Sequence, residues 1–485
     1  MRTVELKWSK FQNSKILHIF TNCFLVIAFG IASGWVVAQG SMIILIFISA
    51  MTLLALLLYL QTRTIEVFTL QRILLYLTII AGFVGSAFLA IPVGPIHIFP
   101  YRVLLPILWF ILIIQILANQ GKLAISHIKV KRYLLFLGVW LIYAIFSMAW
   151  AVSKSDAIKD IIFLFTNVSI IFFVVYYFSN DKDLKRFYYL WLAVFGGLLL
   201  LGVWEHLTGQ HLPVSGHYIE PTGVFHNPND YATFLALSIP FALGALRYAK
   251  NMLVRLIGLG EVATAFYLIV VIGSRANILA VLLEIAFLVL LLTNLRQKLK
   301  ITVAAIVCLA IAVLFLPGPV QQFFSQVSDQ LSSLATQAQL GTGSVAVRMN
   351  LAQNGLIFLY STVGFGVGAG NAEHWMANFA RYDTAGILNP HNWWLEILVN
   401  YGIFVFIGYV VMYIRIIRKL WHAWHKAVDR KERMIAETLL LAFIGFFFAS
   451  ISSSSIMAFN PQWLLFAFAL AFLNWQLRSQ KGWLG

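Results

Sequence analysis

The sequence predicts an all-α polytopic membrane protein, and three observations support that fold class. First, 61% of the 485 residues are hydrophobic and only 11% are charged. Second, apolar runs of about twenty residues, the length of a helix that crosses a bilayer, recur along the whole chain. Third, these runs are continuous rather than alternating. That favours helices over a closed barrel, the other structure that satisfies its backbone hydrogen bonds in lipid.

We expect a bundle of about 12–14 transmembrane helices with one large extracytoplasmic loop. The fourteen apolar spans lie approximately at residues 16–38, 41–60, 73–91, 102–119, 133–151, 161–178, 187–206, 230–246, 256–272, 278–293, 301–316, 391–414, 437–456 and 462–477. Residues 1–206 are predicted to form N-terminal transmembrane helices. Residues 207–485 form a second region, which contains the long loop 317–390.

The basic residues predict the orientation of these spans. If the N-terminus is cytoplasmic, alternate loops hold all but six of the 34 Lys and Arg residues, as the positive-inside rule requires. The six left at the outer face are Arg102, Lys154, Lys159, Arg275, Arg348 and Arg381. We therefore predict a cytoplasmic membrane protein with both termini cytoplasmic.

The net charge of +16 is accounted for by this orientation and by attraction to anionic lipid, so it does not indicate a nucleic-acid partner. The only two cysteines, Cys23 and Cys308, fall inside predicted spans and indicate neither a disulfide framework nor a metal site. The outer carboxylates are not spaced as a ligand set for a cation: Asp156, Asp160, Glu220, Glu373 and Asp383. The sequence predicts no cofactor, and it does not indicate an oligomeric state.

The long loop is predicted to be functional, because structured loops of this length seldom serve only as connections. Apolar residues between 320 and 334 recur at helical spacing, which predicts an amphipathic helix on the outer surface. A second helix is expected after Ser344, which is suited to cap it. The glycine-rich stretch Gly364–Gly370 predicts flexible backbone beside a substrate.

His391 is a candidate catalytic residue. Asn389 is suited to the N-cap and Pro390 to the first helical position, which places His391 in the first turn of the span 391–414. The positive end of the helix dipole disfavours imidazolium, and a general base must be neutral before it accepts a proton. The alternative is an interfacial histidine beside an aromatic belt.

Arg275 and Arg348 are candidate anion-binding residues. Arg275 lies in the tight outer turn Gly273–Asn277, and Arg348 lies in the long loop. Arginine at the membrane centre costs roughly 2.5–3.5 kcal/mol on insertion scales and less at the interface, so a compensating anion would explain both positions. A guanidinium group fits phosphate oxygens bidentately. The alternative is an arginine bonded to helix-end carbonyls or to lipid phosphate.

Four segments, taken in order and with their common outer placement, resemble the shared domain of the O-antigen ligase and polymerase superfamily. They are Gly223–Ala232, Ser274–Ala276, Arg348 with the glycine-rich stretch after it, and His391–Gly402. The resemblance covers roughly residues 220–410 and implies that residues 207–485 form an O-antigen ligase/polymerase-like domain. In length, the chain is nearest to Gram-positive wall-polysaccharide polymerases of the teichuronic-acid type.

The resemblance implies a metal-independent, inverting membrane glycosyltransferase with a GT-C-like bundle. Its donor would be a glycan on undecaprenyl pyrophosphate and its acceptor another glycan or glycolipid. His391 would be catalytic and the two arginines would bind pyrophosphate. The polar residues of the resembling segments would support the acceptor and the loops: Asn227, Asn229, Asn392 and Glu396.

Three functions remain open from the sequence. A polymerase and a ligase would use the same donor and the same site, and would differ only in the acceptor. A flippase for lipid-linked oligosaccharide is the third. A transport path is expected to show intramembrane charge, whereas the predicted spans hold few charges, chiefly Glu261 and Glu284. Of these three functions, the sequence favours an enzyme that polymerises cell-surface polysaccharide.

Overall fold

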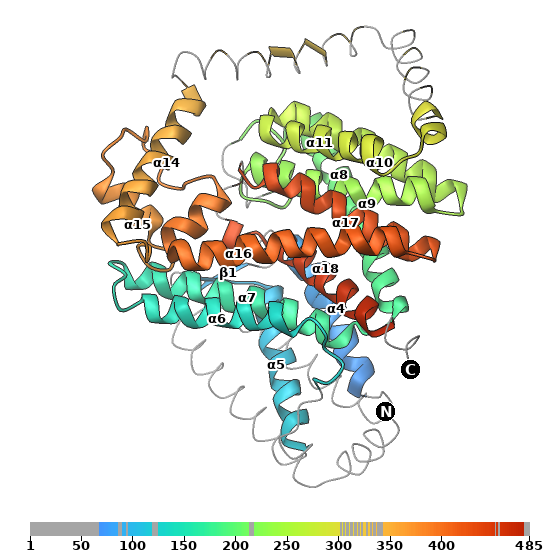
Figure 1. Ribbon diagram of the computed structural model, residues 1–485. Coiled ribbons are helices and arrows are strands. Elements are labelled where there is room, and N and C mark those ends of the chain that lie inside the picture. The colour runs from blue at the N-terminus through green and yellow to red at the C-terminus, as the bar shows by residue number, and fades with distance from the viewer. Residues whose placement is uncertain are drawn as a thin grey trace. The chain divides into compact units, whose positions relative to one another are not determined.

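The protein is an all-α polytopic membrane protein with one short β-hairpin (Figure 1). The computed structural model describes residues 67–85, 90–93, 96–118, 125–212, 218–300, 343–451, 453 and 456–479, with scattered residues between 301 and 342. Within the described part of the chain, six helices are long and apolar enough to cross a membrane. These six are α5, α7, α8, α9, α10 and α16.

The described elements follow in this order: α4 (Val67–Val84), β1 (Ile91–Val93), β2 (Ile96–Ile98), α5 (Pro100–Ala118), α6 (Lys131–Ser147), α7 (Lys154–Tyr177), α8 (Asp181–Thr208), α9 (Pro228–Tyr248), α10 (Met252–Ile272), α11 (Arg275–Leu291), α14 (Gly343–Ser361), α15 (Ala372–Phe379), α16 (Trp393–Lys426), α17 (Arg430–Ala449), the 3₁₀ turn η1 (Ile456–Ala458) and α18 (Asn460–Ser479). Eleven predicted spans coincide with helices here, α4 to α11 and α16 to α18. The spans 16–38, 41–60 and 301–316 lie outside the described residues, as does most of the amphipathic segment 320–334.

Polar caps set where several helices begin. Asn180, Asn227 and Asn251 each accept a hydrogen bond from a backbone N–H in the first turn of α8, α9 and α10. Ser153 does the same for α7, which therefore begins seven residues before the apolar run that predicted it. Such caps satisfy N–H groups that a helix start otherwise leaves without partners.

The chain forms two compact units. The first comprises Met1–Ala81 and Leu89–Ile125, where β1 and β2 pair in an antiparallel hairpin that leads into α5. The second comprises Gly82–Phe88 and Ser126–Gly485 and contains α6 to α18. The predicted division at residues 206 and 207 rests on the family resemblance and stays a prediction.

In the second unit, α9 is the central helix. It packs against α10, α11 and α17, and α18 packs against α7 (Figure 1). Small side chains let these helices approach closely. A Cβ added at Gly258 would lie 2.8 Å from the carbonyl oxygen of Ala242, so α10 meets α9 at a glycine. Every residue from Tyr231 to Ala245 is buried as a result.

The long loop contains two helices that pack on α16. Leu351 and Phe358 of α14, Met376 of α15, and Leu395 and Val399 of α16 form one buried apolar cluster. Helix α14 begins at Gly343, so Ser344 lies inside it rather than at its cap. This cluster holds the loop against the start of α16, where the candidate site lies.

The glycine-rich stretch is held in place by hydrogen bonds, which corrects the expectation of flexible backbone. The N–H groups of Val367 and Gly368 donate to the carbonyls of Val399 and Asn400 at 2.8 and 3.0 Å, and Ile403 N–H donates to Gly364 at 2.9 Å. Glycine is needed here for close approach rather than for mobility. A Cβ on Gly366 would lie 2.5 Å from the backbone nitrogen of Gly402.

Candidate functional site

His391 lies just before helix α16 rather than inside it. The helix begins at Trp393, and its N-cap is Asn392, whose side-chain oxygen accepts from the N–H groups of Trp394 and Leu395. The prediction that Asn389 caps this helix, with His391 in its first turn, is therefore wrong. Both asparagines are competent caps, and the second one takes the position, which shortens the expected helix by two residues.

A short polar chain fixes the backbone at His391. The Oδ1 atom of Asn389 accepts from the His391 N–H at 2.8 Å, and its Nδ2 donates to Oε1 of Glu373 at 2.7 Å. His391 itself has a φ of 47°, in the left-handed region that residues other than glycine seldom adopt. Glu373 on α15 therefore acts through Asn389 to stabilise an unusual conformation at the candidate base.

The pKa of His391 is lowered from its ordinary value of 6.5. Burial of the half-buried imidazole is the main cause, and the positive charge of Arg348 adds to it. The charge of Glu373 and a hydrogen bond with the Ser453 backbone act in the opposite direction. The net lowering of the pKa favours the neutral ring, the state in which it can accept a proton.

Arg348 and Arg275 lie close enough together to influence each other electrostatically. The Arg348 side chain is exposed, yet the atoms crowded around its guanidinium group lower its pKa, and the charge of Arg275 lowers it further. Arg348 sits one turn before Leu351, which anchors α14 in the loop cluster. Arg275 is the first residue of α11, where the helix dipole also favours an anion.

The start of α9 joins this site through Asp230. Asn227 caps α9, and its Nδ2 donates to Oδ2 of Asp230 at 2.6 Å. The hydroxyl of Ser453 donates to the other oxygen of Asp230. Since the Ser453 backbone also bonds to His391, this serine connects the α9 start to the candidate base.

Asn229 connects the same segment to the turn that carries Arg275. Its Oδ1 accepts from the Ser274 hydroxyl at 3.0 Å, and Ser274 in turn accepts from Nδ2 of the buried Asn277 at 2.9 Å. Four stretches far apart in the sequence thus meet: the start of α9, the start of α11, α14, and the residues before α16. They are the segments that carry the family resemblance.

Asn392 and Glu396, two of the residues predicted to support the acceptor and the loops, make contacts that the sequence did not predict. Asn392 uses its side chain as the cap of α16. Glu396 is buried and close to Tyr401, whose hydroxyl donates to the buried Asp160 of α7. These contacts place Glu396 toward the junction of α16 with α7, while Asn227 and Asn229 lie in the network around His391 and Arg275.

The sequence analysis did not predict the positioning roles of Glu373 and Asn389. Asn389 was assigned as a cap, and Glu373 carried no signal beyond its place in the outer loop. Ser453 belongs to the run Ser452–Ser455 at the outer end of a predicted span, a pattern compatible either with the lining of a polar cavity or with a hydroxyl-rich helix end. Among the described residues, no cluster of three or more His, Cys, Asp or Glu side chains is arranged to hold a metal ion.

Helical spans and a polar site at the ends of several of them define a multi-pass membrane protein. A family model described as O-Antigen ligase matches residues 262–410, which include Arg275, Arg348 and His391. The chain is also 31% identical over 445 residues to the teichuronic acid biosynthesis protein TuaE of Bacillus subtilis (strain 168), an alignment that covers 89% of this chain and 91% of that protein. The chain belongs to the O-antigen ligase family.

Proposed function

We propose that this protein is a membrane glycosyltransferase that builds a cell-surface polysaccharide from a glycan carried on undecaprenyl pyrophosphate. The observation that supports the proposal is that Arg348 lies close to Arg275 and to His391, whose pKa is lowered and whose backbone has a positive φ. The arginines suit the two negative phosphates of such a donor. Family membership supports the glycosyl transfer.

The proposed reaction is a single displacement with inversion at the anomeric carbon of the donor. The acceptor hydroxyl oxygen forms the new bond to that carbon, and the bond from the carbon to the pyrophosphate oxygen breaks. His391 accepts the hydroxyl proton, and undecaprenyl pyrophosphate departs with the electron pair. Arg275 and Arg348 stabilise the charge that develops on the leaving group, so the mechanism requires no metal ion.

Polymerisation is the favoured outcome of this transfer. The relative TuaE is named for teichuronic acid biosynthesis, and the alignment extends over most of both chains. We infer that the acceptor of this protein is a second lipid-linked repeat of a wall polysaccharide. A ligase would use the same site with a different glycolipid or wall acceptor.

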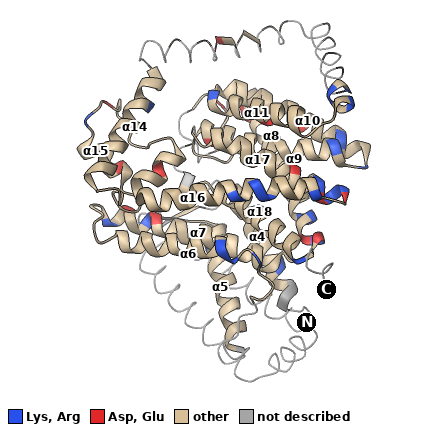
Figure 2. Cartoon of the chain, in the orientation of Figure 1, with Lys and Arg blue, Asp and Glu red and all other residues tan. Residues whose placement is uncertain are grey.

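We further propose that the site faces outward, with both chain termini in the cytoplasm. The helices support this orientation, because α9, α11 and α16 begin at the candidate site and run to ends rich in Lys and Arg (Figure 2). Basic loops stay on the cytoplasmic side. The donor would then be used after it has crossed the membrane.

The test uses the purified full-length protein in lipid nanodiscs with a labelled glycan on undecaprenyl pyrophosphate. We expect longer glycan on the lipid carrier and release of undecaprenyl pyrophosphate, both read by mass spectrometry. The His391→Ala variant should lose this activity by roughly 10²–10⁴-fold, the usual contribution of a positioned base. His374→Ala, the same change on the neighbouring helix α15, is the matched control and should keep it.

Retention of most activity by His391→Ala would contradict the proposed base. Reversible loss of activity with EDTA would contradict the metal-independent mechanism. Movement of the lipid-linked glycan across the bilayer without a new glycosidic bond would make the protein a flippase instead.

A further inference from the structure

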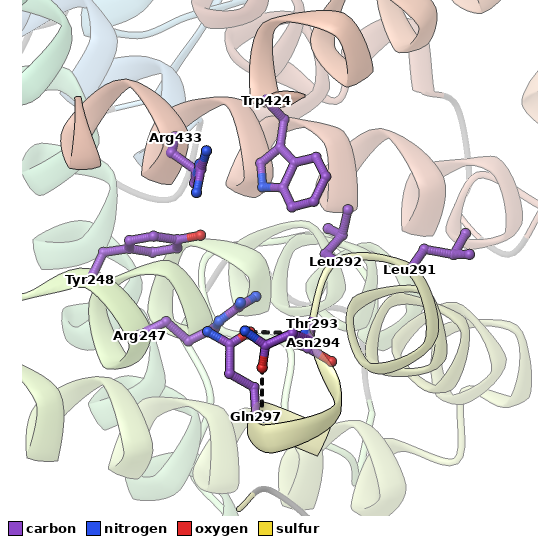
Figure 3. Close-up of a pocket in the computed structure, with 9 residues that line it drawn as sticks. All are labelled: Arg247, Tyr248, Leu291, Leu292, Thr293, Asn294, Gln297, Trp424 and Arg433. Carbon is purple, nitrogen blue, oxygen red and sulfur yellow. Dashed lines mark hydrogen bonds between the residues drawn. The ribbon is translucent and has the colours of Figure 1, made fainter. Parts of the chain in front are cut away.

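A second polar feature lies at the opposite end of the helices that form the candidate site. It is a cavity of about 400 Å³ between the ends of α9, α11 and α16 and the start of α17 (Figure 3). Its lining residues are Arg247, Tyr248, Leu291, Leu292, Thr293, Asn294, Gln297, Trp424 and Arg433. Helices α9 and α11 start at the candidate site and end at this cavity. The full length of these helices, with a rise of about 1.5 Å per residue, therefore separates the cavity from the candidate site.

Two arginines give the cavity its charge. Arg247 pairs with Glu437 at 2.5 Å, and Tyr248 and Trp424 also donate to that carboxylate, at 2.7 and 3.0 Å. Arg433 is also close enough to Glu437 to interact with it electrostatically. One carboxylate thus faces two guanidinium groups, which leaves a net positive charge at the cavity.

The Arg433 guanidinium group can donate further hydrogen bonds to a ligand. Its Nη2 donates to the carbonyl of Ala427 at 3.2 Å, and its guanidinium lies 6.0 Å from the centre of the Trp424 ring. A guanidinium group carries five N–H donors, so one carbonyl uses only part of them. The Gln297 side chain adds an amide donor to the cavity, because only its oxygen is used, to accept from the Asn294 N–H.

The cavity is apolar on one side. Leu291 and Leu292 lie at one edge of the cavity and Arg247 and Tyr248 at the other, with the indole of Trp424 between them (Figure 3). Leu290 and Leu291 at the end of α11 are 65% and 54% exposed, which places bare apolar surface next to the cationic groups. Inorganic phosphate has no apolar group to pack on that surface, whereas the acyl chains of a lipid would cover it.

We propose that this cavity binds the phosphate headgroup of an anionic phospholipid from the adjacent leaflet. Arg433, with Arg247 and the Gln297 amide, would hold the phosphate, and the acyl chains would lie along the exposed leucines of α11. Basic recesses between helices at the cytoplasmic end of membrane proteins bind anionic headgroups by this combination of charge and apolar contact. The site would stabilise the junction of α9 with α17, since Arg247 and Glu437 join these helices.

The experiment measures lipid binding to the full-length protein, delipidated in detergent. Phosphatidylglycerol, phosphatidylcholine with the same acyl chains, and inorganic phosphate are added separately. Native mass spectrometry counts retained lipid, and thermal unfolding measures stabilisation. We expect phosphatidylglycerol alone to be retained and to raise the unfolding midpoint.

Arg433→Gln should weaken phosphatidylglycerol binding about tenfold or more, since a hydrogen bond to a charged group is lost. Gln297→Leu should weaken it less and leaves the arginines in place. Lys431→Gln is the matched control, because Lys431 is an exposed cation of the same helix that does not line the cavity. Equal retention of phosphatidylcholine, stabilisation by inorganic phosphate alone, or equal loss in Lys431→Gln would each overturn the proposal.

Discussion

At the scale of single residues, the site depends on how His391 is held. A histidine with a φ of 47° needs support from outside its own segment, and Asn389 and Glu373 provide it through side-chain hydrogen bonds. The candidate base is thus positioned by a residue two positions away and by another on α15. A sequence motif centred on the histidine shows neither contact.

Substitution of Glu373 should change the pH dependence of glycan transfer, which tests this arrangement. A general base works in its neutral form, so the rate should rise with pH through the pKa of His391 and then level off. Because that pKa is lowered, the rising limb should lie below pH 6.5. Glu373→Gln keeps an oxygen for Asn389 but removes a charge that raises the pKa of His391, so the limb should move to lower pH.

The measurement is the pH dependence of kcat/KM for glycan transfer in the parent and in Glu373→Gln. Asp383→Asn is the matched control, because this exposed acid of the same loop bonds its own neighbour Ala385 and is not among the groups that shift His391. A limb that stays in place in Glu373→Gln would show that Glu373 is only structural.

The two arginines should differ in how substitution affects them. Arg275→Lys keeps the charge but loses the planar fork, so it should reduce donor use while leaving some activity. Arg348→Ala removes the charge as well and should reduce kcat/KM by about tenfold to a hundredfold, the value of a charge-assisted hydrogen bond. Kinetics with varied donor concentration provide the measurement. Unchanged donor kinetics in both folded variants would assign the arginines a structural role.

At the scale of elements, the glycine-rich stretch and α16 cross each other backbone to backbone. Gly402 interrupts the helical geometry of α16 with a φ of 77°, and a Cβ there would lie 2.3 Å from the carbonyl oxygen of Gly364. This crossing holds the loop that carries Arg348 and Glu373 against the start of α16. The structure of the loop therefore depends on glycines that allow two backbones to approach closely.

Gly402→Ala should destabilise the protein strongly. The left-handed conformation alone costs a non-glycine residue of the order of 1–3 kcal/mol, and the clash with a fixed backbone adds to that. Gly386→Ala is the matched control: its φ is 76°, but a Cβ there meets nothing within 4 Å. We expect a large fall of the thermal unfolding midpoint, or loss of the folded protein, for Gly402→Ala and a small fall for Gly386→Ala. Similar midpoints for the two would mean that close approach is not what requires Gly402.

The helices were predictable from the sequence, but the contacts between them were not. Apolar runs located eleven helices to within a few residues at most ends, because burial in lipid demands such runs. The cap of α16 was predicted at Asn389 and lies at Asn392, because both asparagines are competent caps. The chain from Asp230 through Ser453 to His391 joins residues more than 150 positions apart along the sequence, and no local pattern encodes such a pairing.

At the scale of the whole molecule, the orientation decides which compartment the site faces. Lys and Arg gather at the ends of α9, α11 and α16 away from the candidate site (Figure 2), which predicts that these ends are cytoplasmic. Single cysteines at exposed loop positions can test this, after Cys23 and Cys308 are replaced by serine. Asp383 of the long loop and Val428 between α16 and α17 are both exposed.

A membrane-impermeant maleimide should label Asp383→Cys in intact cells with a permeable wall and should label Val428→Cys only after the membrane is disrupted. The reason is that the two positions lie at opposite ends of α16, a helix of 34 residues that is long enough to cross the bilayer. Both variants should keep transfer activity, which shows that each reports on the native fold. Labelling of Val428→Cys but not of Asp383→Cys in intact cells would place the arginines and His391 in the cytoplasm. The donor would then be used before it crosses the membrane, and the proposed order of export followed by polymerisation would be wrong.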